Sequence, residues 1–503
     1  MGITAKRNNF EQEDFVPVLL IAIALLVNIG WMLYTNYTEE DAFITFRVAQ
    51  NIALGHGFVY NLGEPLYGST TPLLSLLLAV WIRFISPNVV FAARLINIIA
   101  TAGMLFFTWQ ALKALNRSTF EQIGVLLALL TSSKLLYMNT QGMETPVALA
   151  LLSASWYFWL KDRPNLAGLM CGLLLWTRID LAFWVMIFVV FSAFYSLKDA
   201  LRIALIAAAI YLPWVVFAFL YFGSPIPFTV TAKWVAYNMF DKTPYWGHLL
   251  IIFEYLSPFR ADGKLSLWGT AISFILIAWG LWTYRAAPKK GLILLVIFIE
   301  FEVARLTYTR TTYFSRYFVP ILWAALILVG VGFGALWERI KDTRLDKQFF
   351  LSFSIILFML QLGTSLHFAS LTRERQIYRH EQSLKAMGLW LKENTEPNSL
   401  ILLEPLGYVG YYSERRMFDE VGLVTPAVVS LKREHIQAEK YATIFRPDYV
   451  IIHCGDTIRI PPVSDTGPNY SLAVRFDPLK FTETMPNEPA LPWLSCYEIW
   501  QRQ

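Results

Sequence analysis

Long apolar runs alternate with short polar segments along the first 370 residues of the chain. The runs have about 15 to 23 residues, a length that allows an α-helix to cross ~30 Å of hydrocarbon. We interpret the first run as a span and not as a signal peptide, because no small-residue cleavage site follows it and the membrane pattern continues. The pattern predicts about eleven membrane-spanning helices, near residues 16–34, 90–112, 122–138, 146–160, 165–179, 181–196, 200–222, 266–284, 291–309, 317–337 and 349–370.

A further apolar run, Thr71 to Ile85, is short and has Pro72 near its start. If this run does not cross, the polar segments on one side of the membrane each carry at least two Lys or Arg, which is the positive-inside pattern of a cytoplasmic face. These segments are Met1–Phe15, Ala111–Glu121, Lys161–Asn165, Ser196–Arg202, Arg285–Lys290 and Glu338–Gln348. We therefore interpret 71–86 as an interfacial or re-entrant segment, with the N-terminus in the cytoplasm and the protein in the inner membrane.

This topology leaves a first outer loop at 35–89, a second large outer loop at 223–264, and everything after about 371 on the outer face. The last part is charged. It has strand patterns at Ser399–Leu403, Asp448–His453 and Cys496–Gln501 and a helical pattern at His380–Asn394. We predict a transmembrane catalytic domain at 1–370 and a small extracytoplasmic α/β domain at 371–503. A disulfide between Cys454 and Cys496 of this domain stays open.

Composition supports a membrane protein. The 503 residues are 56% hydrophobic and only 16% charged, whereas a soluble domain has roughly 25% charged residues. The net charge of +5 is modest, so we expect membrane lipids, and no nucleic acid, among the partners.

Charged residues recur at the outer ends of the predicted spans, where the positive-inside rule does not explain them. We expect them to line one cavity that opens to the outside. They are Glu40, Asp41 and Arg47 in the first loop, Glu144, Arg178, Asp180, Lys233 and Arg316, and His56 is a further candidate for the substrate pocket.

Each of these residues also has a structural interpretation that stays open. Thr38 could cap a helix that starts at Glu39, so that the acids complement the helix dipole. Glu144 could be a solvated loop acid, Arg178 and Asp180 could pair with each other, and His56 could be a turn residue. The cations Lys233 and Arg316 could instead contact lipid headgroups.

The functional interpretation assigns chemistry by residue type. Of a carboxylate pair such as Glu40 and Asp41, one member can deprotonate a hydroxyl while the other orients it or binds a cation. Arg47, Lys233 and Arg316 can bind a phosphate, since Arg offers bidentate geometry and Lys a point charge.

Several motifs resemble those of bacterial GT-C glycosyltransferases, which are multi-pass enzymes that use polyprenyl-phosphate sugars. The resemblance is strongest to the branch of the terminal β-arabinofuranosyltransferase, and weaker to lipid A aminoarabinose transferase and protein O-mannosyltransferases. The matching segments are Glu40–Ala49, Gly55–Glu64, Gly68–Leu73, Gly142–Thr145, Thr177–Asp180, Tyr221–Pro227 with Thr231–Lys233, Gly407–Ser413 and Phe418–Leu423.

The resemblance implies a catalytic base in the first outer loop, Asp41 or Glu40, and cations that bind the lipid phosphate. The chain departs from the family at three positions. It has Glu40-Asp41 where two consecutive aspartates are usual, Ile179 where a proline is common, and Tyr67 where an acid is often found. The aspartate that the family keeps favours Asp41 slightly.

We therefore expect an inverting transfer of one sugar, hexosyl or pentosyl, from a polyprenyl-phosphate donor to a hydroxyl of an envelope glycan, lipid or protein at the outer face. No metal-binding Asp-x-Asp motif occurs in the outer segments, and participation of a divalent cation stays open. Glu404 and Asp419 of the outer domain could contribute, with solvated surface acids as the alternative. The rival functions are a transporter or flippase and an oligosaccharide ligase or polymerase of lipid-linked glycans.

Overall fold

The computed structural model describes the chain except for residues 1–3, 240, 258–263, 286–288, 313, 343, 462–467 and 479–495. It divides into two compact units. The first, here called the membrane unit, comprises Met1–Tyr34, Arg94–Pro213 and Lys242–Ser370. The second, here called the outer unit, comprises Thr35–Ala93, Trp214–Asp241 and Leu371–Gln503. The first loop and the C-terminal region therefore belong to the same compact unit.

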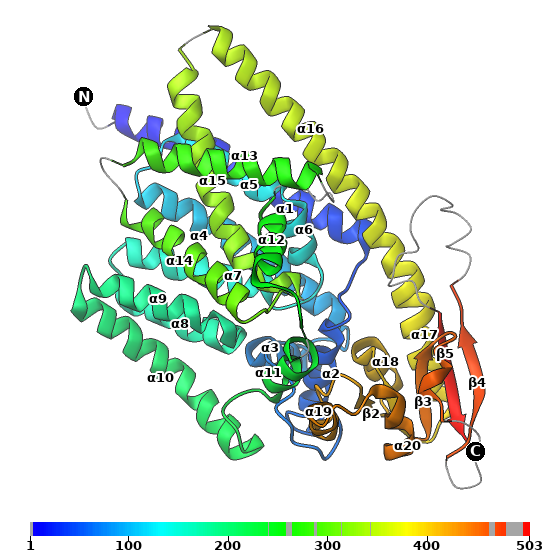
Figure 1. Cartoon of the computed structure of the whole chain (residues 1–503). Coiled ribbons are helices and arrows are strands. Elements are labelled where there is room, and N and C mark those ends of the chain that lie inside the picture. Colours follow the sequence, from blue (N-terminus) through cyan, green and yellow to red (C-terminus); the bar gives the residue numbers. More distant parts are fainter. Residues whose placement is uncertain are drawn as a thin grey trace. The chain divides into compact units, whose positions relative to one another are not determined.

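The secondary structure described for the membrane unit is helical (Figure 1). The helices are α1 (Thr4–Thr35), α4 (Val89–Ala114), α5 (Thr119–Thr131), α6 (Ser133–Thr140), α7 (Thr145–Leu160), α8 (Pro164–Thr177), η1 (Ile179–Leu181), α9 (Ala182–Ala193), α10 (Leu197–Phe222), α12 (Tyr245–Leu256), α13 (Lys264–Thr283), α14 (Lys290–Tyr308), η3 (Ser315–Tyr317), α15 (Val319–Ile340) and α16 (Arg344–Arg375).

Within the described residues, five helices are long and apolar enough to cross a membrane, or six if the bent pair α5–α6 counts as one span. The five lie on α1, α4, α10, α15 and α16, and α5 and α6 meet at 63°. Four other predicted spans fall on the shorter apolar helices α7, α8, α9 and α13, and one falls on α14. The chain is a multi-pass α-helical membrane protein, and the count of eleven spans stays a prediction.

Glycines allow α5 and α15 to pack closely. A Cβ atom on Gly330 or Gly334 would overlap the backbone of α5, and one on Gly124 would overlap the carbonyl of Gly330. Small residues at such crossings let two helix backbones approach, which is how membrane helices gain packing contacts. Around this crossing α15 is almost wholly buried, with Trp323 and Ile327 fully inaccessible to solvent.

The outer unit combines helices with one sheet. Its helical elements are α2 (Ala42–Ala53), α3 (Pro72–Phe84), α11 (Phe228–Lys233), η2 (Trp234–Asn238), η4 (Gln376–Lys385), α17 (Ala386–Asn394), α18 (Leu406–Ser413), α19 (Pro426–Arg433), η5 (Ala438–Lys440), α20 (Tyr441–Phe445) and η6 (Thr457–Arg459). Its strands are β1 (Leu400–Leu403), β2 (Arg416–Asp419), β3 (Tyr449–His453), β4 (Tyr470–Phe476) and β5 (Tyr497–Arg502).

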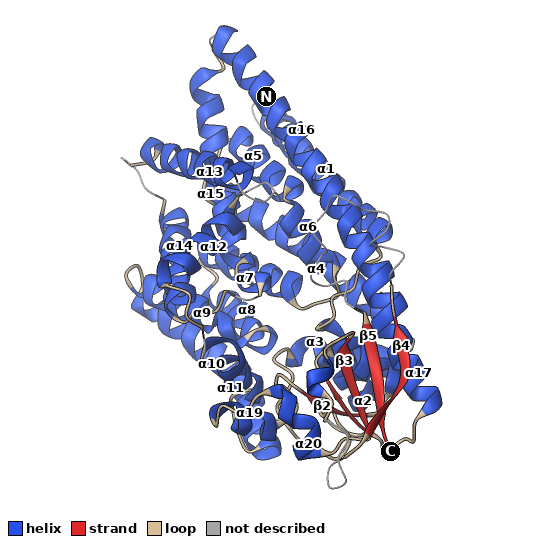
Figure 2. Cartoon of the chain, turned by 45° about the vertical axis from the view of Figure 1, so that its right-hand side comes forward, coloured by secondary structure: helices blue, strands red, loops and turns tan. Residues whose placement is uncertain are grey.

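The strand order is β2-β1-β3-β5-β4, and the sheet is seen in Figure 2. β1 runs parallel to β2 and β3, whereas β5 is antiparallel to β3 and β4. The three strands expected from the sequence are confirmed as β1, β3 and β5, and the helical pattern at His380–Asn394 as η4 and α17. The sequence analysis missed β2 and β4.

Both faces of the parallel part of the sheet are buried. Leu402, Val450 and Ile452 pack with Val428 and Tyr441 in one apolar cluster, and strand neighbours that point the other way, such as Ile401, are also inaccessible. Burial on two faces is typical of parallel strands with helices on either side. A disulfide joins Cys454 at the end of β3 to Cys496 before β5, which resolves the pairing that the sequence left open.

The α3 helix has 13 residues, which at 1.5 Å per residue gives about 20 Å, short of the ~30 Å hydrocarbon thickness. The helices α8 and α9, which have 14 and 12 residues, are similarly short, so the interpretation of 71–86 as a segment that does not cross stays a prediction. Pro72 is the first residue of α3, where its missing N–H would be unpaired in any helix.

Candidate active site

The acidic pair of the first loop lies at the start of α2. The helix begins at Ala42 with Asp41 as its N-cap residue, so the expectation that Thr38 caps a helix starting at Glu39 is wrong. The backbone N–H of Thr38 instead donates to the side chain of Gln376, 3.1 Å away. Glu40 and Asp41 are both half-buried.

Glu40 is tied to the C-terminal region. The backbone N–H of Gly407, in the first turn of α18, donates to Oε1 of Glu40. A Cβ atom on Gly407 would overlap the backbone carbonyl of Glu40, so glycine is needed for this close approach. Burial, followed by the charges of Asp41 and Glu404, raises the pKa of the Glu40 carboxyl well above its usual value. This shift favours the protonated form of Glu40.

Arg47 is engaged with the protein backbone. Its Nε donates to the carbonyl of Tyr60 at 2.9 Å, Nη1 to that of Gly410 at 2.7 Å, and Nη2 to that of Arg415 at 2.6 Å. The guanidinium also lies 4.3 Å from the centre of the Tyr60 ring, and the residue is 6% exposed. This geometry favours a structural role, in which Arg47 connects α2 to α18, over the phosphate contact expected from its charge.

Two charged residues near the acidic pair were missed or undervalued by the sequence analysis. Glu404 directly follows β1, and its pKa is raised by burial, while the guanidinium of Arg379 opposes that rise and the charge of Asp41 adds to it. Arg379 lies within η4, a π-helical segment, and π-helical turns are frequent at functional sites. In the sequence Arg379 stands among other basic and acidic residues, and nothing local distinguishes it.

Asp419 is not the solvated surface acid that the sequence suggested as the alternative, and its neighbour Glu420 is also buried. The carboxylate of Asp419 is buried and accepts hydrogen bonds from the backbone N–H groups of Gly422, Leu423 and Val424, at 2.6 to 2.8 Å. It therefore holds the turn after β2. Glu420 forms an ion pair with Arg459, and burial raises its pKa to about 7.

The other two candidates of the outer unit are more accessible. Lys233 is the last residue of α11 and is half-buried. His56 is exposed in the turn after α2, where its backbone N–H donates to the carbonyl of Asn51 at 2.9 Å, as in the turn interpretation.

The remaining candidates belong to the membrane unit. Nη2 of Arg178 contacts Oδ2 of Asp180 at 2.7 Å, and its Nη1 donates to the backbone carbonyl of Arg316 at 3.0 Å. The structure thus contains the ion pair considered as the structural alternative. Glu144 is buried, and its Oε2 has no hydrogen-bond partner among the described residues.

The membrane unit also holds a buried ion pair that the sequence analysis overlooked. Oε2 of Glu302 lies 2.5 Å from Nε of Arg305, and their side chains are 3% and 12% exposed. A carboxylate and a guanidinium three residues apart on one helix are a recognisable signal, and an apolar span makes such a pair unusual. The guanidinium of Arg305 also interacts electrostatically with Asp180, so both ion pairs form one network.

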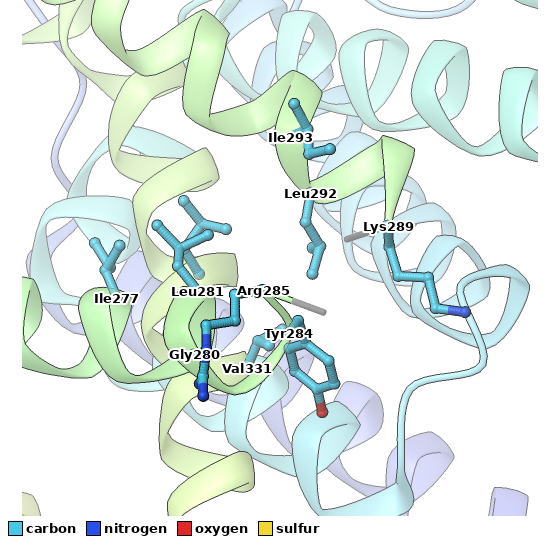
Figure 3. A pocket seen from close by; sticks show the side chains of 10 residues that line it. Ile277, Gly280, Leu281, Tyr284, Arg285, Lys289, Leu292, Ile293 and Val331 are labelled. Atoms are coloured by element: carbon cyan, nitrogen blue, oxygen red, sulfur yellow. The ribbon is translucent and has the colours of Figure 1, made fainter. Parts of the chain in front are cut away.

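The candidates thus form two groups. Glu40, Asp41, Arg47, His56 and Lys233 lie in the outer unit, and Glu144, Arg178, Asp180 and Arg316 lie in the membrane unit. Among the described residues, no three His, Cys, Asp or Glu side chains are placed so that they could hold a metal ion. A pocket between α13 and α14, with a cavity volume of about 60 Å³, is lined by apolar residues with Arg285 and Lys289 (Figure 3), and it is too small for a sugar.

The fold is similar to solved structures of membrane transferases. ArnT from Cupriavidus metallidurans bound to undecaprenyl phosphate matches with a TM-score of 0.61 at 13% identity, over 96% of this chain and 97% of that one. Its apo state matches with a TM-score of 0.57 at 12% identity, over the same shares. Arabinofuranosyltransferase AftD from mycobacteria matches with a TM-score of 0.50 at 13% identity, over 96% of this chain and 39% of that one.

Sequence comparison adds one match. Residues 373–497 match a domain of unknown function, DUF8728. No curated protein sequence matches the chain. The structural likeness establishes the fold, which is the GT-C membrane fold expected from the first-loop motif.

Proposed function

We propose that the chain is an inverting glycosyltransferase that moves one sugar, hexosyl or pentosyl, from a polyprenyl-phosphate donor to an acceptor hydroxyl at the outer face of the membrane. The observation that carries this proposal is the acidic pair Glu40–Asp41 at the start of α2. The pair lies in a fold that is similar, over 96% of this chain, to that of ArnT bound to undecaprenyl phosphate. The acceptor class proposed from the sequence is an envelope glycan, lipid or protein.

Asp41 is the proposed base. Two neighbouring carboxyls do not both ionise readily, and the environment decides which keeps the proton. Burial and the charges of Asp41 and Glu404 raise the pKa of Glu40 well above its usual value, which favours its protonated form. Asp41 is then the carboxylate that is available to accept the proton of a hydroxyl.

The proposed step is a single displacement. The acceptor hydroxyl gives its proton to Asp41, and its oxygen forms a bond to the anomeric carbon of the donor sugar. The bond between that carbon and the phosphate oxygen breaks, and polyprenyl phosphate leaves with the electron pair. Attack from the face opposite the phosphate inverts the anomeric configuration.

Negative charge grows on the phosphate as it leaves, so a cation placed there in advance lowers the barrier, by ~3 kcal/mol for one well-placed donor. Lys233, which belongs to the outer unit together with Asp41, is the proposed phosphate ligand. Arg316 belongs to the membrane unit, and its phosphate contact stays a prediction from the sequence. The guanidinium of Arg316 lies over the rings of Phe314 and Tyr317, 4.4 and 5.8 Å from their centres. Arg47 is a weaker candidate because its guanidinium already donates to three carbonyls.

A cavity of the membrane unit supports a lipid donor. Helices α12, α13 and α14 surround a volume of about 580 Å³ that is lined mainly by apolar side chains, among them Leu249, Phe253 and Phe274. Tyr245 and Tyr308 also line it, and aromatic residues of this kind are enriched at membrane interfaces. An apolar cavity of this size suits part of an isoprenoid chain.

The test is donor consumption by the full chain in lipid nanodiscs. Radiolabelled polyprenyl-phosphate sugars would be offered one at a time with crude envelope glycan as acceptor, to the wild type, Asp41→Asn and Glu40→Gln. Consumption of one donor that is lost in folded Asp41→Asn supports the proposal. Consumption unaffected by either substitution would remove the proposed base.

Reconstitution of the full chain in sealed lipid vesicles separates the rival functions. A transporter or flippase would move the labelled lipid across the bilayer without breaking the sugar–phosphate bond, and a ligase or polymerase would act on oligosaccharide donors only. The proposed step uses no divalent cation. Repeating the donor-consumption assay with a chelator, and with added Mg²⁺ or Mn²⁺, tests whether one takes part.

A further inference from the structure

The sheet of the outer unit has an edge suited to binding a ligand. In the sheet, β2 lies on one side of β1 and β3 on the other, with β5 and β4 beyond β3. The connections from β1 to β2 and from β2 to β3 therefore run in opposite directions across the sheet. In sheets with such a switch point, ligands bind in the crevice beyond the carboxyl ends of the parallel strands. Glu404 directly follows β1 at this edge, and Glu420 directly follows β2.

The first loop reaches the same edge. The hydrogen bond from Gly407 to Glu40, with the close approach that excludes a Cβ atom on Gly407, holds the acidic pair beside the turn between β1 and α18. Glu404 lies in that turn, three residues before Gly407. The proposed base, Asp41, is therefore next to the carboxyl edge of the sheet, and its charge acts on the pKa of Glu404.

Two charged side chains at this edge have no hydrogen bond or ion pair with any described residue. Glu404 is exposed although protein surrounds it closely enough to raise its pKa. Arg379 is half-buried on the π-helical segment η4, and its Nε is inaccessible and without a partner in the described part of the chain. The guanidinium of Arg379 acts electrostatically on both Glu40 and Glu404. A carboxylate and a guanidinium that face each other without direct contact leave hydrogen-bonding capacity for a ligand.

We propose that Glu404 and Arg379 bind the acceptor of the transfer reaction by contacting neighbouring hydroxyls of a sugar, with Glu404 accepting and Arg379 donating hydrogen bonds. This inference rests on the proposed function and extends it, because it places acceptor binding at the carboxyl edge of the outer sheet and makes the acceptor a neutral, polyhydroxylated group.

Charge decides against an anionic acceptor. Besides Glu40, whose raised pKa favours the protonated form, four acids interact electrostatically around this edge, against three cations, so a phosphate or carboxylate on the acceptor would add to an excess of negative charge. The acids are Asp41, Glu404, Asp419 and Glu420, and the cations are Arg379, Lys432 and Arg459. A neutral sugar satisfies both partners, since each hydroxyl can donate to a carboxylate and accept from a guanidinium.

Acceptor binding at this edge would bring a hydroxyl to the base. A sugar held between Glu404 and Arg379 presents a further hydroxyl toward Asp41, and fixing that oxygen in place supplies much of what a bimolecular reaction lacks. Glu404 and Arg379 are thus substrate-binding residues, and their loss should weaken binding of the acceptor.

The test uses Glu404→Gln and Arg379→Gln in the full chain in nanodiscs, with Glu414→Gln as the matched control. Glu404 stands just before α18 and Glu414 just after it, and Glu414 is paired with Lys392 at the surface, away from the acidic pair. Binding is measured against a panel of neutral oligosaccharides and their phosphorylated counterparts. Acceptor KM, kcat and the slow hydrolysis of the donor without acceptor are measured in parallel.

We expect a neutral glycan to bind the wild type and Glu414→Gln equally, and to bind Glu404→Gln and Arg379→Gln about tenfold or more weakly, with acceptor KM raised. No glycan bound by the wild type, a preference for phosphorylated glycans, or binding unchanged in both variants would overturn the inference. If the wild type consumes no donor at all, the proposed function is contradicted. The binding measurements then still test whether the carboxyl edge of the sheet binds a glycan, because they do not depend on donor consumption.

Discussion

The backbone N–H of Gly407 donates a hydrogen bond to the carboxylate of Glu40, 367 residues earlier in the chain. This contact joins the first outer loop to the C-terminal region, and the hydrogen bonds from Arg47 to the carbonyls of Gly410 and Arg415 reinforce the connection. The proposed catalytic acid pair and the sheet therefore belong to one compact unit. We therefore expect a substitution at the carboxyl edge of the sheet to affect the acidic pair, and a substitution in the acidic pair to affect that edge.

Gly407→Ala should destabilise the outer unit. The added Cβ would overlap the backbone carbonyl of Glu40 and approach its carboxylate, and a backbone atom cannot rotate away. We expect a loss of about 1–3 kcal/mol in the free energy of unfolding, measured as a lower thermal midpoint of the purified protein. Gly363→Ala is the control, because nothing lies within 4 Å of a Cβ there and alanine favours a helix by about 1 kcal/mol. Equal midpoints for the two variants would contradict the close approach.

Asp41→Asn and Glu40→Gln should separate chemistry from stability. We expect Asp41→Asn to lower kcat by about 10²–10⁴-fold, because it removes the proposed base, and to leave the thermal midpoint unchanged. Glu40→Gln keeps an oxygen that can accept from Gly407, and since Glu40 tends to keep its proton, the neutral amide should retain much of the activity. A larger loss of kcat in Glu40→Gln than in Asp41→Asn would indicate that Glu40, and not Asp41, is the base.

Arg47→Lys should lower stability and not donor affinity. A lysine cannot donate to three carbonyls in the planar arrangement that the guanidinium uses. The carbonyls of Tyr60 and Gly410 keep the donors Asn51 and Glu414, so the cost is that of the lost hydrogen bonds from a charged group, about 1.5–3 kcal/mol each. Arg416→Lys is the control, since Arg416 is 56% exposed in its ion pair with Glu64 and surface pairs contribute about 0–1 kcal/mol. A raised donor KM with an unchanged thermal midpoint would restore the phosphate contact that the sequence suggested.

The sequence was informative wherever the signal is local. Apolar runs located the long helices because hydrocarbon selects composition over about 20 residues, and the runs of β1, β3 and β5 are apolar enough to be recognised as strands. β2 was missed because Arg416–Asp419 has only Met417 and Phe418 as apolar residues. The start of α2 was misplaced because Thr38 uses its backbone N–H for a partner 338 residues away.

The site depends on contacts that leave no local trace. Arg47 looks like a free cation until the carbonyls of Tyr60, Gly410 and Arg415 are placed around it. Asp419 looks like a surface acid, yet three backbone N–H groups of the following turn surround it. Arg379 gains significance only from the π-helical turn and the acids it faces. Sequence alone could select the acidic pair but not its neighbours.

The Cys454–Cys496 disulfide should stabilise the sheet, because it closes a loop with a sequence separation of 42 between β3 and β5. Loop-closure entropy for that length amounts to about 4 kcal/mol. We expect reduction, or the double change Cys454→Ser with Cys496→Ser, to lower the thermal midpoint of the outer unit. Cys171→Ser is the control, since Cys171 is a free, buried thiol of the membrane unit, and a midpoint insensitive to reductant would contradict the prediction.

Glu420 should make stability fall as the pH rises from about 4.5 to 7. Burial raises the pKa of Glu420 to about 7, against the opposing effect of the Arg459 guanidinium, so the folded protein holds this proton up to a higher pH than the unfolded chain does. Over that interval the folded state binds more protons, and the free energy of unfolding decreases with pH by up to about 3 kcal/mol. Glu420→Gln cannot ionise, so its stability relative to the wild type should rise between pH 4.5 and 7 and level off above. Thermal midpoints across that range, with the exposed Glu434→Gln as control, provide the measurement; a constant difference between Glu420→Gln and wild type would show that the Glu420 carboxyl does not carry this proton.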